Sequence, residues 1–350
     1  MVEEVNITPR NNNFLLGQTK AEEIFLKAWK KQTMHHAWIL SGPRGIGKAT
    51  LAYRIARFLL WADDTKKELY NSLNVPEDSP VFKQVSTGAH PDLMVLERDY
   101  IETDRKKIIK ALQKGEAMEE DELSSLKKSA FIRVDDVRKV NEFLAKTSFD
   151  GNWRVVIIDS ADEMNKNAAN ALLKILEEPP VHTILLLISH NAGTLLPTIR
   201  SRCAKLPIQV LNVDETASLL RRYRPNLKEA MIAKIAKMCP QSIGQAILYA
   251  DTDAVGLYDN LCKILYAKQK FLLSDLLDFC NEAAVDADKF NLLQELILRF
   301  IRENMAQAQD VEALYACWDE TNRVFADCQN INMDKRQGLL NLITKISKVL

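Results

Sequence analysis

A glycine-rich segment, Gly42 to Thr50 (GPRGIGKAT), constrains the fold more than any other part of the sequence. It matches the GxxxxGK pattern of phosphate-binding loops, whose glycines permit tight turns and let backbone N–H groups approach phosphate oxygens. The short apolar run Ala37–Leu40 precedes it, and residues 49–60 place apolar side chains at helical spacing. Strand, loop and helix in this order predict a P-loop fold, in which Lys48 lies near the β- and γ-phosphates of a nucleotide.

Further short apolar runs alternate with helical patterns along the chain. They cover residues 93–96, 155–158, 184–188 and 204–208. Continuous apolar runs of this length are typical of strands buried on both faces, and their alternation with helices indicates a parallel α/β sheet. Beyond residue 210 the patterns are helical throughout. We therefore predict a P-loop α/β core over 1–209, a small helical lid over 210–252 and an all-α C-terminal domain over 253–350.

The sequence lacks two groups that a magnesium-dependent ATPase uses. A P-loop places a hydroxyl on Mg²⁺ directly after the lysine, but that residue is Ala49 here. Thr50 is turned roughly 100° further around the helix and is a weak substitute. Asp159 ends a predicted strand where an aspartate would help to hold Mg²⁺, but Ser160 follows in place of the glutamate that activates water. Because loss of a general base lowers a rate by about 10²–10⁴-fold, we expect ATP to bind weakly or without hydrolysis.

Two more residues bear on this site. Glu163, four residues beyond Asp159, is a conceivable replacement base, and Ser189 ends the fourth predicted strand, where its hydroxyl can meet a γ-phosphate or water. We predict no metal ligands. The candidate nucleotide-binding residues are Gly42, Gly45, Gly47, Lys48, Ala49, Thr50, Asp159 and Ser189.

Arg202 lies within the segment Pro197–Cys203 (PTIRSRC), just after a proline-bounded turn. A guanidinium that reaches the γ-phosphate of a neighbouring subunit stabilises transition-state charge and contributes about 10³–10⁵ in rate. A lone surface arginine more often forms an ordinary ion pair, but the surrounding motif favours the first interpretation. We therefore predict no catalytic residue acting on the chain's own site and Arg202 as an arginine finger acting in trans.

Composition limits the remaining functions. The chain has 350 residues, 47% of them hydrophobic, and its 47 basic and 47 acidic residues give a formal net charge of zero. Such a chain argues against a large nucleic-acid surface of its own. The six cysteines form no CxxC pair and the five histidines have no metal-ligand spacing. No apolar run reaches the roughly 20 residues that a membrane span needs, and the prediction is a cytoplasmic protein.

The stretch 104–128 is dense in charge of both signs and contains the acidic block 119–122 (EEDE). Mixed charge of this kind is more typical of a solvated helical insertion than of a binding patch. The wider segment 98–130 receives no functional assignment.

Together these segments resemble the AAA+ clamp-loader subunits of bacterial DNA polymerase III, over about residues 16–208. The most specific segments are HAW at 36–38 before the P-loop, HPD at 90–92, NALLKILEEPP at 170–180 and LPTIRSRC at 196–203. Ala49 and Ser160 separate the chain from the ATP-hydrolysing tau/gamma subunits. The lid segment 241–246 also lacks their second-sensor arginine. The resemblance is closer to the delta-prime branch.

The resemblance implies a hetero-pentameric ring with tau/gamma and delta subunits, held together by C-terminal helical collar domains. Through that complex the chain would help ATP-driven loading of a sliding clamp onto primed DNA during replication. It would be part of a DNA-directed DNA polymerase (nucleotidyltransferase) holoenzyme without intrinsic ATPase or polymerase activity. Many relatives carry a four-cysteine zinc module before the HPD segment, but residues 61–90 contain no cysteine, so no zinc is expected.

Two other functions remain open at this point. The first is an ATP-hydrolysing motor subunit of the tau/gamma type, in which Thr50 and Glu163 replace the missing groups. The second is a phosphotransferase on the same loop, which would need an acceptor pocket and lid chemistry that the sequence does not show.

Overall fold

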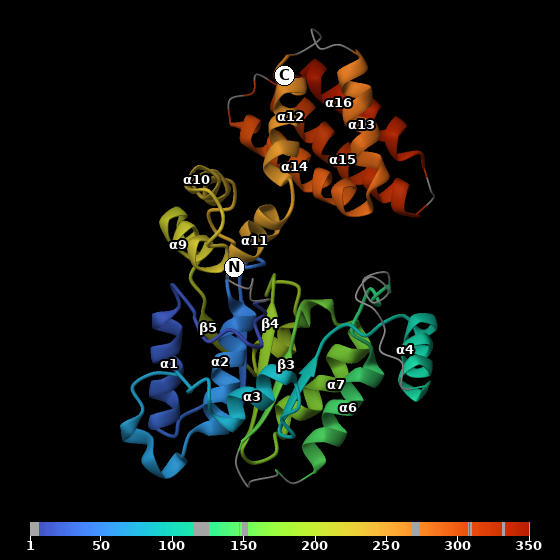
Figure 1. Cartoon of the computed structure of the whole chain (residues 1–350). Coiled ribbons are helices and arrows are strands. Elements are labelled where there is room, and N and C mark those ends of the chain that lie inside the picture. The colour runs from blue at the N-terminus through green and yellow to red at the C-terminus, as the bar shows by residue number, and fades with distance from the viewer. Residues whose placement is uncertain are drawn as a thin grey trace. The chain divides into compact units, whose positions relative to one another are not determined.

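The computed structural model describes residues 7–114, 126–146, 148, 153–267, 273–306, 308, 310–330 and 333–349 (Figure 1). The acidic block 119–122 lies outside these residues. Before it, the charged stretch forms helix α4 (Glu102–Lys114), so the predicted helix is confirmed over 104–114, whereas residues 126–128 are not helical.

A five-stranded parallel sheet forms the centre of the N-terminal part. The strands are β1 (Ala37–Ser41), β2 (Leu93–Leu96), β3 (Arg154–Ile158), β4 (Thr183–Ser189) and β5 (Ala204–Pro207). Their order in the sheet is β2-β3-β4-β1-β5. Each strand lies where the sequence predicts one, and every residue of β3 and β4 is buried. The predicted parallel α/β core is confirmed.

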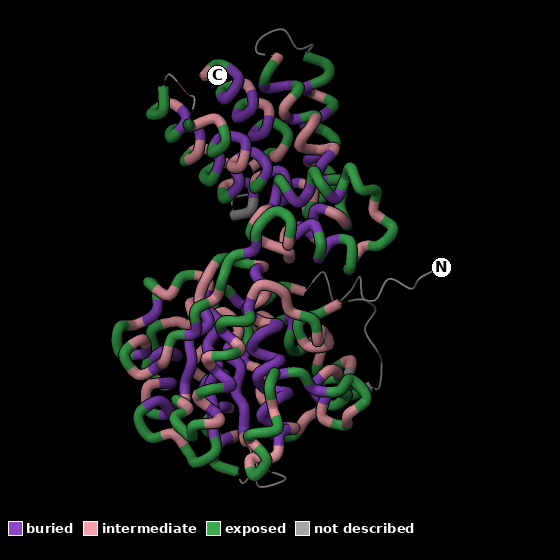
Figure 2. The backbone as a smooth tube through the Cα atoms, turned by 90° about the vertical axis from the view of Figure 1, so that its left-hand side faces the viewer, coloured by how far each residue is buried: buried purple, intermediate pink, exposed green. Residues whose placement is uncertain are grey.

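Helices cover both faces of this sheet (Figures 1 and 2). Helices α1 (Thr19–Lys30), α2 (Lys48–Trp61) and α3 (Pro80–Thr87) share one apolar core, and α6 (Val134–Ala145) and α7 (Lys166–Glu177) share the other. Successive side chains of β1 alternate between the two: Trp38 and Leu40 belong to the first core, Ala37 and Ile39 to the second. This period of two is the pleat of a strand, and it explains why both sets are apolar.

The polar residues of the segment 62–90 and its prolines at 76 and 80 predict an irregular chain, but the segment is partly helical. It contains a 3-10 helix, Asp64–Leu69, as well as α3. Ser79 caps α3 because its Oγ accepts a hydrogen bond from the N–H of Phe82 at 3.2 Å, and Pro80 occupies the first helical position. The prediction of an irregular chain was wrong here, because serine followed by proline is a common start of a helix and the sequence contains it at 79–80.

An aromatic cluster packs the same segment against the core. The ring of Tyr70 meets Trp29, Phe58 and Trp61 edge-on, with centroid distances of 5.7, 5.5 and 5.5 Å. Asp64 accepts a hydrogen bond from the indole of Trp29 at 3.0 Å. Edge-to-face pairs of buried rings stabilise beyond their area alone, so this cluster ties the segment to α1 and α2.

Residues 7–16, the N-terminal strap, are held against α2 by two buried arginines. Arg57 is fully buried and donates to the carbonyl oxygens of Arg10 and Asn12 at 2.7 and 2.6 Å. Arg54 pairs with Glu22 at 2.7 Å and also contacts the carbonyl of Asn13. Desolvation lowers the pKa of Arg57 to about 10, and it remains charged at neutral pH. Because α2 starts at the P-loop, the strap is fixed relative to that loop.

The rest of the chain is helical, as the sequence predicts. The short helices are η2 (Ala161–Glu163) and α8 (Pro197–Arg200), followed by α9 (Val213–Tyr223), α10 (Glu229–Met238) and α11 (Ile243–Asp251). Leu211, Leu219 and Tyr223 form a small core that contacts the strap and the start of α11.

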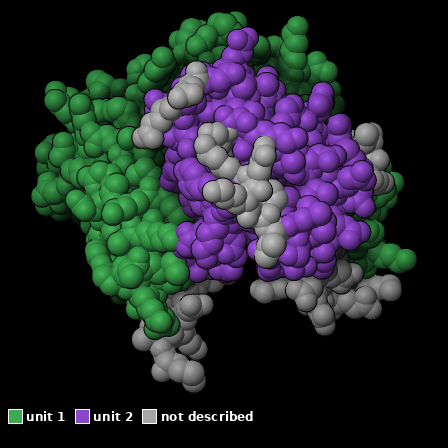
Figure 3. Space-filling model, turned by 90° about the horizontal axis from the view of Figure 1, so that it is seen from above, with its two compact units in different colours: residues 1–247 green, residues 248–350 purple. Residues whose placement is uncertain are grey.

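The chain divides into two compact units, residues 1–247 and 248–350, coloured separately in Figure 3. The second unit contains α12 (Ala254–Tyr266), α13 (Leu273–Val285), α14 (Ala287–Met305), α15 (Val311–Asn330) and α16 (Lys335–Val349). The finer division into core, lid and C-terminal domain remains a prediction. Over the residues described, no helix is at once long and apolar enough to cross a membrane.

Replacing Arg57 with alanine should lower the free energy of unfolding by roughly 2–4 kcal/mol, because the carbonyl groups of Arg10 and Asn12 lose their charged donor and a fully buried side chain is removed. Urea unfolding of the whole chain, followed by tryptophan fluorescence, measures the change. Arg221→Ala is the control, since Arg221 is an exposed partner of Glu229 and such pairs contribute at most about 1 kcal/mol. Equal losses in the two variants would contradict a buried anchoring role for Arg57.

Candidate nucleotide site and an arginine at the opposite edge

The P-loop connects β1 to α2 in the predicted strand–loop–helix arrangement. Gly45 and Gly47 have φ of +75° and +96°, in the left-handed region that favours glycine. A Cβ at Gly45 would also lie 2.1 Å from the Oγ of Ser242 in the segment before α11. Glycine at both positions therefore permits the turn of the loop, and at position 45 it also permits the close approach of Ser242.

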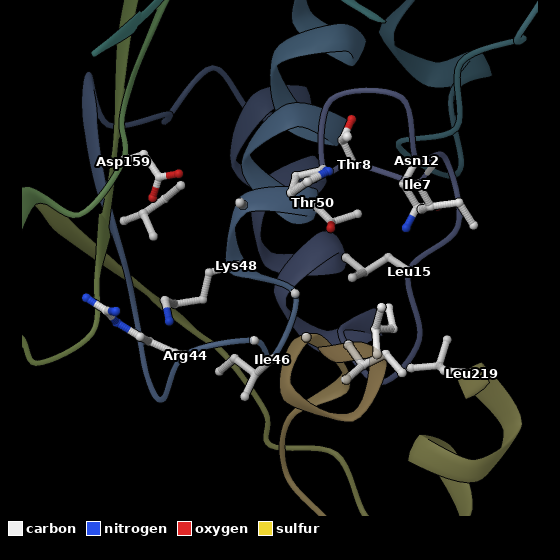
Figure 4. Close-up of a pocket in the computed structure, with 18 of the residues that line it drawn as sticks. Ile7, Thr8, Asn12, Leu15, Arg44, Ile46, Lys48, Thr50, Asp159 and Leu219 are labelled. Carbon is white, nitrogen blue, oxygen red and sulfur yellow. The ribbon is translucent and has the colours of Figure 1, made fainter. Parts of the chain in front are cut away.

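A cavity of about 420 Å³ opens beside this loop. Figure 4 shows a polar end with Arg44, Lys48 and Asp159, and an apolar end with Ile7, Leu15 and Leu219 from the strap and α9. A cavity with one apolar and one polar end suits a ligand that joins a flat ring to charged groups. The predicted residues that line it are Gly45, Gly47, Lys48, Ala49, Thr50 and Asp159.

Two predicted residues do not line the cavity. Gly42 contributes through its backbone, since its carbonyl oxygen accepts a hydrogen bond from Lys48. Ser189 is fully buried within β4, and its Oγ has no hydrogen-bond partner within the described part of the chain. The residues on either side of Ser189, Ile188 and His190, line the cavity instead.

The ammonium group of Lys48 is bound by the chain itself. Its Nζ donates to the carbonyl oxygens of Gly42 and Pro43 at 2.7 and 2.6 Å and lies 3.2 Å from Nδ1 of His190. Desolvation lowers the pKa of Lys48 to about 8, against the opposing effect of Asp162 and Asp159. A phosphate that binds here must therefore displace contacts that the lysine already makes.

His190 is a site residue that sequence reasoning missed. Its Nε2 lies 3.1 Å from the Oγ of Ser160, and desolvation followed by the charge of Lys48 lowers the pKa of the ring. Since Lys48 only donates, Nδ1 must accept, so the neutral ring carries its proton on Nε2 and donates it to Ser160. In that tautomer Nε2 cannot remove a proton from Ser160 or from water. Residue 190 directly follows β4, which lies next to β1 in the sheet. A polar residue at this position was the sequence signal that could have identified His190 as a site residue.

Glu163 is occupied by two ion pairs. One carboxylate oxygen lies 2.9 Å from Arg44 and the other 2.7 Å from Arg98, a second residue that the sequence analysis missed. Arg98 stands two residues after β2, at the same edge of the sheet as the P-loop. Both oxygens of this carboxylate are occupied by guanidinium groups, so the geometry gives no support to Glu163 as a replacement for the missing glutamate.

The residues present do not fit a magnesium ion bound as in a P-loop ATPase. Ala49 offers no oxygen, and no group of three or more His, Cys, Asp or Glu side chains among the described residues is arranged to hold a metal. Burial, together with the negative charges of Glu97 and Glu163, raises the pKa of the remaining aspartate, Asp159. We derive no step through Mg²⁺.

The start of α11, with Ser242 just before it, lies directly on the P-loop. The N–H of Gly244 donates to the carbonyl of Gly45 at 3.1 Å, and Ser242 caps the helix by accepting from the N–H of Gln245 at 3.1 Å. A Cβ at Gly244 would meet the Cα of Gly45 at 3.0 Å. The start of α11 therefore presents backbone to the loop at this point.

Arg202 lies at the other edge of the sheet. Ala204 of β5 pairs with Trp38 of β1, so Arg202 is level with the amino end of β1, whereas the P-loop follows its carboxyl end. Six residues at about 3.3 Å each separate the two levels by roughly 20 Å, which exceeds the reach of an arginine side chain. The side chain of Arg202 is 36% exposed and cannot reach its own P-loop.

The sheet order, the P-loop and the helices that follow define a P-loop protein of the AAA+ class. A family model described as "DNA polymerase III, delta subunit" matches residues 17–212, more than half of the chain. The chain belongs to this family, and the predicted likeness to a clamp-loader subunit of the delta-prime kind is confirmed.

Individual relatives agree with this placement. The chain is 36% identical over 191 residues to DNA polymerase III subunit delta' of Pseudomonas aeruginosa, and 28% over 194 residues to that of Bacillus subtilis. Each match covers 55% of this chain and 48% of the relative, so the chain spans about half the length of these curated proteins. A gamma subunit of Buchnera aphidicola is 26% identical over 255 residues, covering 69% and 60% of the two chains.

Lys48 should titrate near pH 8 in the folded protein, well below its ordinary 10.5, because burial disfavours the ammonium form. The depressed value means that Lys48 lowers stability below about pH 8, and that this penalty fades as the pH rises toward 10.5. Lysine-selective ¹³C labelling and an NMR pH titration measure the value. The early-titrating signal should vanish in Lys48→Met; if every lysine titrated near 10.5, the proposed burial of Nζ would be refuted.

Proposed function

We propose that the chain is a delta-prime-like subunit of the DNA polymerase III clamp loader that does not hydrolyse ATP and supplies Arg202 to the ATP site of a neighbouring subunit. In this role it takes part in DNA replication by helping ATP-driven loading of the sliding clamp onto primed DNA. The observation that supports this most is the position of Arg202. Its side chain is 36% exposed, and the length of a strand separates it from the chain's own P-loop.

The chain's own site supports a non-hydrolysing role. Ala49 has no hydroxyl for a metal, Ser160 takes the place of the water-activating glutamate, and the tautomer of His190 excludes it as a base. Lys48 is already bound by its own loop. In this proposal ATP binds weakly or without turnover, and zinc is not required.

The proposed partners are tau/gamma and delta subunits in a hetero-pentamer, with the second unit serving as the collar. Clamp and primed DNA would be reached through the complex, since the chain has a formal net charge of zero. The chain would act in the cytoplasm as part of a polymerase holoenzyme, without polymerase activity of its own.

A hydrolysing subunit of the tau/gamma type is the second candidate, because Thr50 does line the cavity and gamma relatives match more of the chain. The ion pairs of Glu163 with Arg44 and Arg98 argue against it. Measured turnover of ATP by the isolated chain, abolished in Lys48→Ala, would favour this candidate.

Replacing Arg202 with alanine should reduce clamp- and DNA-stimulated ATP hydrolysis by the reconstituted loader severalfold. A trans arginine contributes about 10³–10⁵ at one site, but the other sites retain their own arginines and limit the overall fall. Steady-state hydrolysis assays measure the change, and gel filtration checks that the ring still assembles.

Lys205→Ala is the control, because it removes an exposed positive charge three residues away. Normal hydrolysis by an intact Arg202→Ala ring would refute the trans role. An equal fall in both variants would point to general loss of surface charge.

A further inference from the structure

Three signature segments of the sequence meet around Arg202. The guanidinium Nη2 lies 2.8 Å from Oε1 of Glu177, the last residue of α7, and Nη1 donates to the carbonyl of Thr198 at 3.1 Å. The end of α7 is itself fixed, because Nε2 of His36 lies 3.0 Å from the carbonyl oxygen of Leu176. The segments at 36–38, 170–180 and 196–203 therefore form one structure at the amino edge of the sheet.

Glu177 stands where a glutamate is not expected for helix stability. The carboxyl end of a helix carries partial negative charge and favours cations, yet α7 ends in Glu177 followed by Glu178. The ion pair with Arg202 is also solvent-accessible, since the side chains of Glu177 and Arg202 are 52% and 36% exposed. Ion pairs of this kind stabilise a fold little. A role for Glu177 outside folding is the simpler explanation of its position.

The contacts leave part of the guanidinium available. Arginine has five N–H donors in a planar fork, and within the described part of the chain the contacts use Nη1 and one side of Nη2. Nε and the remaining Nη2 hydrogen are left for an incoming anion. A long side chain that is already held in one orientation loses less conformational freedom when it binds a ligand.

We propose that Glu177 is a positioning residue that holds Arg202 in the orientation in which it meets the terminal phosphate of a nucleoside triphosphate bound by the neighbouring subunit. This inference rests on the proposed function. It assigns to the LEEPP segment a task in the neighbour's site, with His36 and the Pro179–Pro180 pair fixing the helix end that carries the glutamate.

The test compares Glu177→Ala, Glu177→Gln and Glu178→Ala in the reconstituted loader, each with Arg202 present or replaced by alanine. Glu178 is the matched control, since it is the next residue, exposed, and removes the same charge. The measurements are kcat and KM for ATP in the presence of clamp and primed DNA, with ring assembly checked by gel filtration.

Glu177→Ala should lower kcat severalfold, by no more than Arg202→Ala does, with KM nearly unchanged. Glu177→Gln should retain most activity because its amide oxygen still accepts from the guanidinium, and Glu178→Ala should match the unmodified loader. With Arg202 already replaced, Glu177→Ala should have no further effect, as expected for residues acting as one unit.

The outcomes separate the two proposals. A fall with Arg202→Ala but not with Glu177→Ala would overturn the positioning role alone. An additive fall in the double variant would show that Glu177 acts elsewhere, and a rise in kcat would show that its charge opposes Arg202. No effect of Arg202→Ala would overturn both the trans role and the inference built on it.

Discussion

The common direction of the five strands is the constraint on which this structure depends. Because every strand of a parallel sheet ends at the same edge, the P-loop, Asp159 and His190 gather at the carboxyl edge. The segment that leads into β5, with Arg202, is placed at the amino edge for the same reason. The two edges can therefore change independently, and substitutions that disable one leave the other in place.

At the carboxyl edge, the groups that a nucleotide and metal would satisfy are bound by the protein. Lys48 donates to its own loop, the ring of His190 connects it to Ser160, and Glu163 neutralises Arg44 and Arg98. The contacts of Lys48, which is 4% exposed, satisfy a group that would otherwise be costly to bury. The polar groups of the site are thus paired within the chain itself.

The sequence located the sheet well because buried parallel strands are continuous apolar runs between helical patterns, a local signal. It also identified the P-loop and the missing hydroxyl at Ala49. It missed His190 and Arg98, whose roles depend on which strand ends are neighbours. It also placed Ser189 in the cavity, although every residue of β4 is buried and Ser189 does not line the cavity. The 62–90 segment was misjudged because its polar residues and prolines predict an irregular chain, whereas Ser79 and Pro80 start a helix. The arginine-finger role and the domain boundaries remain predictions.

Ser160 has a left-handed backbone, with φ of +62° and ψ of +57°, and residues other than glycine, asparagine and aspartate rarely adopt it. A glutamate at this position would meet that strain and would also lose the hydrogen bond to His190. A hydroxyl regained at position 49 alone would bring no general base, and a base regained alone would bring no metal. In the proposed non-hydrolysing role, a single substitution toward a hydrolytic site would therefore bring no activity, and the chain would stay specialised.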